Sequence, residues 1–351
     1  MAAAAAALRR LSASCCSALT PPPLFLRPPT YPSTVSHIRK WKQWAKTLTP
    51  SVGSSFAALD NGPDATLLCR ELNWLLDDVV VHQQDDTSLL PILDHPRQDD
   101  SQPVYLRASL DDLCLMWNQR IHQRRPFQYI VGCQHWRDLV LCVQEGVLIP
   151  RPETELIVDL VSDVIREHSD LKDGVWADLG TGSGALAIGI GRILANGGKV
   201  VATDLSPAAA AVASYNVQRY NLQDKIEIRQ GSWFEPLKDC QQKLAGLVSN
   251  PPYIPSHHIA GLQAEVGMHE PRLALDGGSE GMDYLLHLCN EAASMLKPGG
   301  FFAFETNGKE HCQLLADYLS NGLKGSFSEI KIVSDFADIP RFVTGFRSVP
   351  K

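Results

Sequence analysis

The sequence predicts an α/β fold with a doubly wound parallel sheet, preceded by a small N-terminal helical domain and a β-hairpin connector. After residue 172, apolar runs alternate with helical segments; residues 36–125 show helical periodicity, and a period-two pattern lies between these regions. The 351 residues suffice for two domains, with 44% hydrophobic and 20% charged residues. This balance is typical of globular proteins and argues against a disordered or coiled-coil chain.

The first residues have the composition of a targeting sequence. Asp60 is the first acidic residue, whereas Arg9, Arg10 and five further basic residues precede it. An acid-free opening rich in Ala and Ser, followed by a Pro-rich stretch, is typical of a mitochondrial transit peptide. We therefore expect residues 1–35 to be a transit peptide or a disordered tail, and the protein to be located in the mitochondrial matrix.

Charge and composition limit the classes of partner. The formal charge of −7 disfavours a mainly electrostatic grip on nucleic acid, and the longest apolar stretch is too short and too Gly-rich to span a membrane. Nine cysteines without C-x-x-C spacing suggest reduced thiols rather than a disulfide or zinc framework. We expect no metal, no membrane, no direct nucleic-acid partner and a monomeric protein.

Two regions precede the α/β pattern. Residues 36–125 should form the helical domain, because their apolar residues recur at helical spacing and strand alternation is almost absent. Residues 126–150 alternate with period two on both sides of a turn at 132–138, which predicts a hairpin linking two domains. Pro152 is expected to open a helix with Glu153 and Glu155 near its positive end.

Residues 151–351 should form the doubly wound domain. The expected helices are 185–194, 207–220, 282–296 and 310–319, and the expected strands are 175–179, 200–204, 226–229, 244–249, 301–305, 330–333 and 342–346. In such sheets ligands bind at the carboxyl ends of the strands. The residues directly after each strand are therefore the candidate functional residues.

A glycine-rich loop follows the first of these strands. It contains Asp178, Gly180, Thr181, Gly182, Ser183 and Gly184. Glycines at this spacing permit a tight turn and the close approach of a ligand to the main chain. Asp204, at the end of the second strand, is placed to accept hydrogen bonds from both hydroxyls of a ribose. Because the loop also satisfies G-x-G-x-x-A, a dinucleotide remains an alternative ligand at this point.

The fourth strand runs into Asn250, Pro251, Pro252 and Tyr253. Two prolines make a rigid corner, with an amide side chain directly before it. This tetrapeptide resembles the (N/D)-P-P-(Y/F) signature of S-adenosylmethionine-dependent methyltransferases that act on a planar nitrogen, either an amide or a nucleobase amine. A carboxamide nitrogen is a poor nucleophile because resonance occupies its lone pair. Acceptors at this corner would orient the NH₂ group and stabilise the developing positive charge, with Tyr253 as an aromatic wall.

Taken together, the motifs resemble the HemK/PrmC family of release-factor glutamine methyltransferases, in particular its mitochondrial members. The resemblance spans roughly residues 65–350, and its most specific segments are 126–132 (PFQYIVG), 147–155 (VLIPRPETE) and 270–275 (EPRLAL). It implies a Rossmann-like class I methyltransferase sheet. It also implies methylation of the glutamine amide in the Gly-Gly-Gln motif of peptide-chain release factors, with the helical domain docking that protein.

The resemblance also assigns roles to residues. Asp178, Gly180, Thr181, Gly182, Ser183, Gly184 and Asp204 would hold S-adenosylmethionine, Trp233 would lie against its adenine, and Asn250 would contact both cofactor and substrate. Asn250, Pro251, Pro252 and Tyr253 would hold the glutamine, with Asn250, Pro251 and Tyr253 as catalytic residues. Two positions depart from the family pattern: Ser232 replaces an acidic residue, and Gln134-His135 replaces Glu-Phe.

Alternatives of other classes have less support. An adenine-amine methyltransferase acting on DNA or RNA shares the Asn250 corner, but residues 36–125 contain many acids where a basic recognition region would be needed. A non-catalytic module would have lost a motif residue, and a nicotinamide dehydrogenase leaves the corner unexplained. His257-His258 fits a surface loop better than a metal site. Glu270 and Arg151 fit either a structural ion pair or support of the loops.

Overall fold

The computed structural model describes residues 22–81, 93 and 103–349. The chain divides into two compact units, Met1–Cys133 with Gly261–His269, and Gln134–Ala260 with Glu270–Lys351. We call them the helical unit and the sheet unit. Among the described residues no helix is long and apolar enough to cross a membrane.

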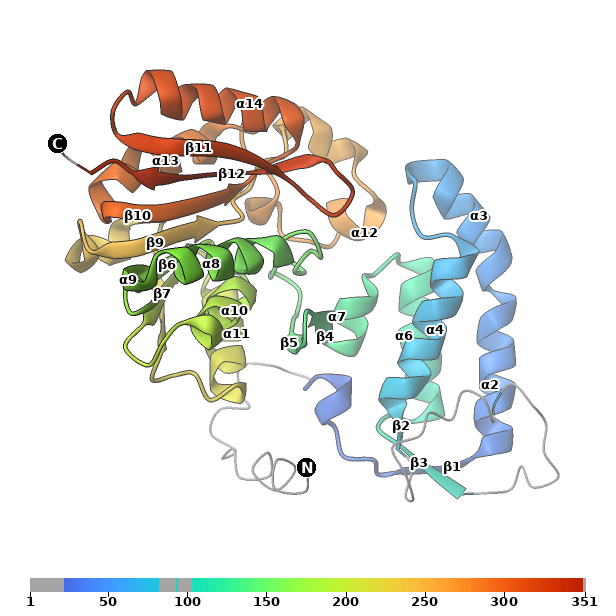
Figure 1. The fold of residues 1–351 in the computed structure, drawn as a ribbon. Helices are drawn as coiled ribbons and strands as arrows, with labels where there is room; N and C mark the ends of the chain where they lie inside the picture. Colours follow the sequence, from blue (N-terminus) through green and yellow to red (C-terminus); the bar gives the residue numbers. More distant parts are fainter. Residues whose placement is uncertain (1–21, 82–92, 94–102, 350–351) are drawn as a thin grey trace. The chain divides into compact units, whose positions relative to one another are not determined.

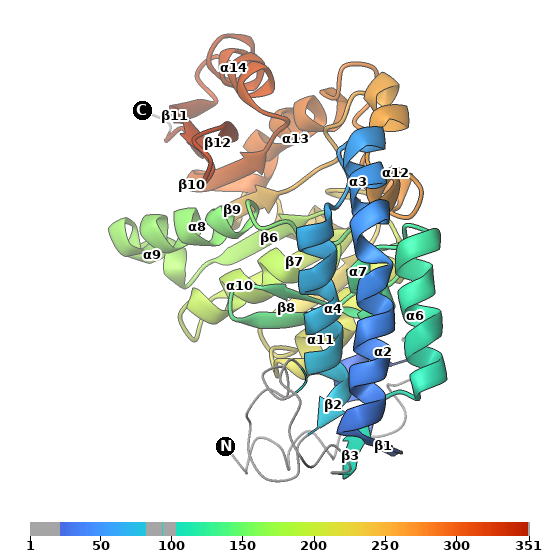
Figure 2. The ribbon, with the colours of Figure 1, turned by 90° about the vertical axis from the view of Figure 1, so that its right-hand side faces the viewer.

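In the helical unit, α2 (Val35–Thr47), α4 (Ala65–Val79) and α6 (Leu110–His122) lie alongside one another (Figure 2). Its helices are α2 (Val35–Thr47), α3 (Thr49–Asp60), α4 (Ala65–Val79), α6 (Leu110–His122), α7 (Phe127–Val131) and the short α12 (Ala264–Gly267). A capping box begins α6, since the amide of Asp112 donates to Ser109 Oγ at 3.0 Å and the amide of Ser109 donates to Asp112 Oδ2 at 3.2 Å.

This unit also contains a small antiparallel sheet that the sequence did not predict. Its strand order is β1 (Tyr31–Thr34), β3 (Pro103–Leu106), β2 (Val80–Val81). The first strand, together with the fully buried Leu24, lies inside the expected presequence. Residues 22–35 are therefore part of the folded unit rather than a disordered tail, and the end of a presequence stays a prediction. Residues 1–21 lie outside the described residues.

The hairpin connector is shorter than expected. Residues 133–142 form it, as β4 (Cys133–Trp136) and β5 (Leu139–Cys142). The segment before it, expected as the first strand, is instead α7, which ends at Gly132 with a φ of 79°. The expectation of a strand from residue 127 was wrong because a five-residue segment with four apolar or aromatic side chains fits both periods.

The sheet unit contains a seven-stranded sheet with the order β11-β12-β10-β9-β6-β7-β8. They are β6 (Val175–Leu179), β7 (Lys199–Asp204), β8 (Ile226–Gln230), β9 (Leu244–Ser249), β10 (Leu296–Glu305), β11 (Phe327–Ser334) and β12 (Pro340–Arg347). The expected α/β class is confirmed. The sheet is mixed rather than wholly parallel, because β12 pairs antiparallel with both β10 and β11.

Helices cover both faces of this sheet, as expected (Figure 1). One core contains residues of α8 (Glu155–Glu167), α10 (Ala185–Ile193) and α11 (Pro207–Arg219), and the other contains residues of α13 (Asp283–Met295) and α14 (Lys309–Asp317). Along β6, Trp176 belongs to the first core and Ala177 to the second. This alternation follows from the period of two along a strand, and it explains why central strands are apolar on both sides.

A buried ion cluster holds residues 261–269 within the helical unit. Arg120 Nε donates to Glu71 Oε2 at 2.6 Å and its Nη1 donates to Glu265 Oε1 at 2.8 Å. Arg124 Nε donates to the same Glu265 oxygen at 2.7 Å, and its Nη2 donates to Asp60 Oδ1 at 3.0 Å. Despite desolvation, the hydrogen bonds from Arg124 and Arg120 lower the pKa of Glu265. The segment that follows the Asn250 corner is therefore anchored by charges from α3, α4 and α6.

Candidate active site

The glycine-rich loop connects β6 to α10 at the carboxyl edge of the sheet. Gly180, Gly182 and Gly184 all have positive φ, between 56° and 85°. A Cβ added at Gly182 would meet nothing within 4 Å, so the main chain is open to a ligand there. Ser183 Oγ is buried and has no hydrogen-bond partner among the described residues, which leaves it available to a bound molecule.

Asp178 lies behind this loop rather than in the cavity. Its Oδ2 accepts hydrogen bonds from Thr181 Oγ1 at 2.6 Å and from the amide of Ala187 at 3.0 Å. Complete burial raises the pKa of the Asp178 carboxyl to about 7, although both hydrogen bonds oppose the shift. The structure therefore places Asp178 as a brace of the loop, and Asp178 is not among the residues that line the cavity.

Asp204 ends β7 and holds the loop from the other side. Its Oδ2 accepts from the amide of Gly182 and its Oδ1 from the amide of Ser206, both at 2.9 Å. Burial raises the pKa of Asp204, and these two hydrogen bonds counteract the rise. Each carboxylate oxygen can accept a further hydrogen bond, so the ribose role expected for Asp204 is compatible with the observed contacts.

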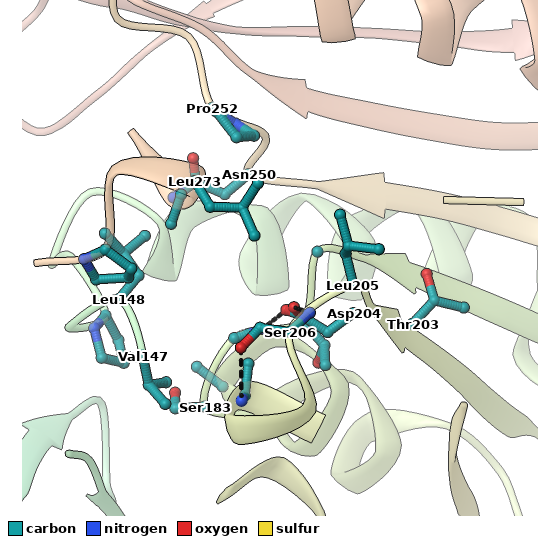
Figure 3. A pocket seen from close by; sticks show the side chains of 18 of the residues that line it. Val147, Leu148, Ser183, Thr203, Asp204, Leu205, Ser206, Asn250, Pro252 and Leu273 are labelled. Atoms are coloured by element: carbon teal, nitrogen blue, oxygen red, sulfur yellow. Dashed lines mark hydrogen bonds between the residues drawn. The ribbon is translucent and has the colours of Figure 1, made fainter. Parts of the chain in front are cut away.

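One cavity joins the carboxyl ends of β6, β7 and β9 (Figure 3). Figure 3 shows Asn250 and Leu273 across the cavity from Asp204 and Ser206. The expected residues that line it are Gly180, Thr181, Gly182, Ser183, Asp204, Trp233, Asn250 and Pro252. The expected residues that do not line it are Asp178, Gly184, Pro251 and Tyr253. Lining residues to which the sequence assigned no role include Thr154, Leu205, Ser206, Leu273 and Tyr284.

Trp233 forms an aromatic wall of the cavity. Its backbone has a positive φ of 45°, and its carbonyl accepts a hydrogen bond from Thr203 Oγ1 at 3.0 Å. Its ring lies 5.4 Å from the ring of Tyr284 in a tilted arrangement. Since a side chain at positive φ is uncommon, the Thr203 contact helps to hold the ring in place. Such a wall is suited to a planar base.

The Asn250 corner is held by a chain of polar contacts. Asn250 Nδ2 donates to Thr154 Oγ1 at 3.1 Å, and Thr154 Oγ1 donates to Glu305 Oε2 at 2.7 Å. The hydroxyl of Tyr253 donates to the other oxygen of Glu305 at 3.0 Å. Burial raises the pKa of Glu305 to about 7 and raises that of Tyr253 above its usual value. These contacts fix Tyr253 against Glu305 beside the cavity.

The signature segments on either side of the corner also contact one another. Arg151 Nη2 donates to Glu270 Oε1 at 2.7 Å, and the amide of Ile149 donates to Glu270 Oε2 at 3.3 Å. The amide of Ile254 donates to the carbonyl of Leu275 at 3.0 Å. Glu270 and Arg151 therefore form an ion pair that braces the 147–151 segment, which contributes residues to the cavity wall.

Sequence reasoning assigned no role to Thr154 or Glu305. Thr154 lies within a segment that the resemblance had marked, but no local pattern distinguished its hydroxyl. Glu305 carried a stronger signal, because it is a charged residue that directly ends the apolar run 301–304. A carboxylate at the carboxyl end of a buried strand is a candidate functional residue on position alone. By contrast, His257 and His258 are exposed, and no group that could hold a metal exists among the described residues.

The cavity fits S-adenosylmethionine. The open main chain at Gly182, the unpartnered Ser183 Oγ and the spare acceptor capacity of Asp204 are complementary to its polar groups. Trp233 offers a face for the adenine, and Leu205 and Leu273 add apolar walls. When bound, this cofactor supplies an electrophilic methyl group on a sulfonium.

Known proteins resemble this chain over most of its length. The methyltransferase small domain family model matches residues 154–268. The release factor glutamine methyltransferase of Synechocystis sp. is 39% identical over 278 residues, 78% of this chain and 88% of the relative. That of Gloeobacter violaceus is 42% identical over 247 residues, which cover 70% of this chain and 82% of the relative. That of Thermosynechococcus vestitus is 35% identical over 309 residues, which cover 87% of this chain and 97% of the relative.

The seven-stranded sheet and the cavity at its carboxyl edge have the organisation of a class I methyltransferase. S-adenosylmethionine is the methyl donor, which removes the dinucleotide and dehydrogenase alternatives. On this similarity, the chain belongs to the release factor glutamine methyltransferase (HemK/PrmC) family.

Proposed function

We propose that this enzyme transfers a methyl group from S-adenosylmethionine to the side-chain amide nitrogen of glutamine in the Gly-Gly-Gln motif of mitochondrial peptide-chain release factors. The observation that carries the proposal is Asn250, whose Nδ2 is engaged by Thr154 while the residue lines the cavity. Its Oδ1 is then the amide atom available to a substrate. The names of the Synechocystis and Gloeobacter relatives support release factors as the protein substrate.

In this proposal the chain's own groups orient the amide and stabilise charge. Asn250 Oδ1 accepts one hydrogen of the glutamine NH₂ group, which aims the nitrogen at the methyl; the carbonyl of Pro251, which does not itself line the cavity, would accept the other where the substrate meets the corner. As the nitrogen gains positive charge, both acceptors interact with it more strongly, so the transition state is stabilised more than the ground state. The proton can leave after the methyl transfer, so no general base is required. Tyr253, fixed by Glu305, restricts water beside the amide.

The test is methylation of a purified release factor with Asn250→Ala as the diagnostic variant. We expect wild-type enzyme to add about 14 Da to the Gly-Gly-Gln peptide, and the variant to be ~100-fold slower or more, with nearly unchanged cofactor affinity. Asn290→Ala, on the exposed side of α13, is the matched control. Methylation of an RNA or DNA adenine instead of the glutamine would overturn the proposal, as would undiminished activity of Asn250→Ala.

The mitochondrial location rests on the acid-free, Arg-containing opening of the chain. Because residues 22–35 belong to the folded unit, the proposed presequence ends before residue 22. A fusion of residues 1–40 to a fluorescent protein should enter mitochondria, and substitution of Arg9 and Arg10 by Glu should prevent import. Import of the fusion into plastids, or fluorescence that stays in the cytosol, would contradict this part of the proposal.

A further inference from the structure

We propose that Thr154 and Glu305 are positioning residues that hold the Asn250 amide with Oδ1 toward the substrate. The inference deepens the proposed function and rests on the role of Asn250 in it. Neither residue is placed against the reacting atoms. They act through the orientation of the Asn250 side chain, which would otherwise be free to turn its NH₂ group toward the substrate.

The direction of each hydrogen bond follows from the number of protons available. A threonine hydroxyl has one proton, and that of Thr154 is donated to Glu305 Oε2 at 2.7 Å. Its oxygen can then only accept, so the Asn250 atom 3.1 Å away must be the donor Nδ2. A reversed amide would set Oδ1 against an oxygen with no proton to offer. The contact would become repulsive, and this favours the observed orientation.

The position of Thr154 indicates that its hydroxyl serves this contact rather than the helix. Thr154 is the N-cap residue of α8, where a threonine hydroxyl ordinarily accepts from a backbone amide of the first turn. No such side-chain cap is formed here. The hydroxyl instead links a side chain that lines the cavity to a buried carboxylate.

While Glu305 is ionised, it makes the Thr154 hydroxyl a hydrogen-bond donor toward it, because a carboxylate only accepts hydrogen bonds. It is fully buried and accepts from both Thr154 and Tyr253. Among the charged groups that act on it, Glu153 raises its pKa and Arg341 lowers it, and Arg341 also pairs with Asp335 at 3.2 Å. Its pKa of about 7 implies protonation at mildly acidic pH. A protonated Glu305 can donate to Thr154, so the preference for one amide orientation is lost.

Enzyme kinetics give the first test. Thr154→Val removes the hydroxyl at constant shape and should lower kcat ~10- to 100-fold, with KM and cofactor affinity within about twofold. Thr154→Ser restores the hydroxyl and should recover most of the activity. We expect the wild-type rate to fall below pH about 7, and Glu305→Gln should lower kcat and abolish this pH dependence. If Thr154→Val retained full activity, or if Thr154→Ser lost as much, the inference would be overturned.

A second readout needs no substrate. In protein labelled with ¹⁵N and saturated with S-adenosylmethionine, the Asn250 side-chain NH₂ signal is identified by its loss in Asn250→Asp. One of its protons should exchange with water about tenfold faster in Thr154→Val than in wild type, because the hydrogen bond is gone. Equal exchange would sink the inference. If wild type failed to methylate any release factor but this difference held, the proposed function would fail while the positioning role stood.

Discussion

Asp204 shows how a single carboxylate can organise a loop and also bind a ligand. Asp204→Ala should weaken cofactor binding by ~1.5 to 3 kcal/mol, because it removes a charged acceptor and releases the amides of Gly182 and Ser206. Calorimetric titration measures the change. Asp163→Ala, an exposed aspartate on α8, is the control and should bind normally. Unchanged affinity in Asp204→Ala would contradict the assignment.

The buried carboxyl of Asp178 should make stability depend on pH. Its pKa rises from 3.8 to about 7 on folding, so the folded state binds more protons than the unfolded state between these values. The free energy of unfolding should therefore fall as pH rises through this window, by up to about 1.4 kcal/mol per pH unit for this group.

Asp178→Asn removes that titration. Relative to wild type, the variant should gain stability as pH increases from 5 to 8, which urea unfolding at both values would measure. Glu305 also titrates in this range in both proteins, so the difference between them isolates Asp178. A difference that does not change with pH would show that Asp178 is ionised throughout.

At the scale of elements, the ion cluster joins α4 and α6 to the segment around α12. Arg120 lies between Glu71 and Glu265, so Arg120→Met removes the guanidinium that pairs with the buried Glu71, while Glu265 keeps its pair with Arg124. Breaking a buried pair in this way should cost ~3 to 5 kcal/mol of unfolding free energy. Arg166→Met, which breaks an exposed pair with Asp163, should cost less than about 1 kcal/mol. Denaturant unfolding measures both variants. Equal losses of unfolding free energy would contradict the expectation that breaking the buried pair costs more than breaking the exposed one.

Some helices and strands could be predicted from the local sequence pattern, and others could not. The strand and helix order after residue 172 could be predicted, because apolar or alternating strand segments there are separated by helical segments and turn signals. The segment 127–131 could not, since its four apolar or aromatic residues satisfy period two as well as a single helical turn. The strands β1, β2 and β3 were missed because strands of two to four residues carry almost no alternation.

For the whole molecule, the folded chain begins earlier than its composition indicated. Removal of residues 1–35 deletes the buried Leu24 and the strand β1 that pairs with β3, which should cost ~3 kcal/mol or more. A chain that starts at residue 22 keeps both. Thermal unfolding of the two truncated proteins should therefore differ by several degrees. Equal melting temperatures would show that β1 does not contribute to stability.

The sequence by itself determined what depends on neighbours along the chain: the turn that exposes the main chain at Gly182, the stiff proline corner after Asn250, and the order of strands and helices. Only the tertiary structure decided which distant side chains act on that corner. Thr154 and Glu305 are 151 positions apart, and Thr154 and Asn250 are 96 apart. Asn250 and Glu305 come close because the parallel strands β9 and β10 end at one edge, and the start of α8 brings Thr154 to both; no local spacing encodes this relation.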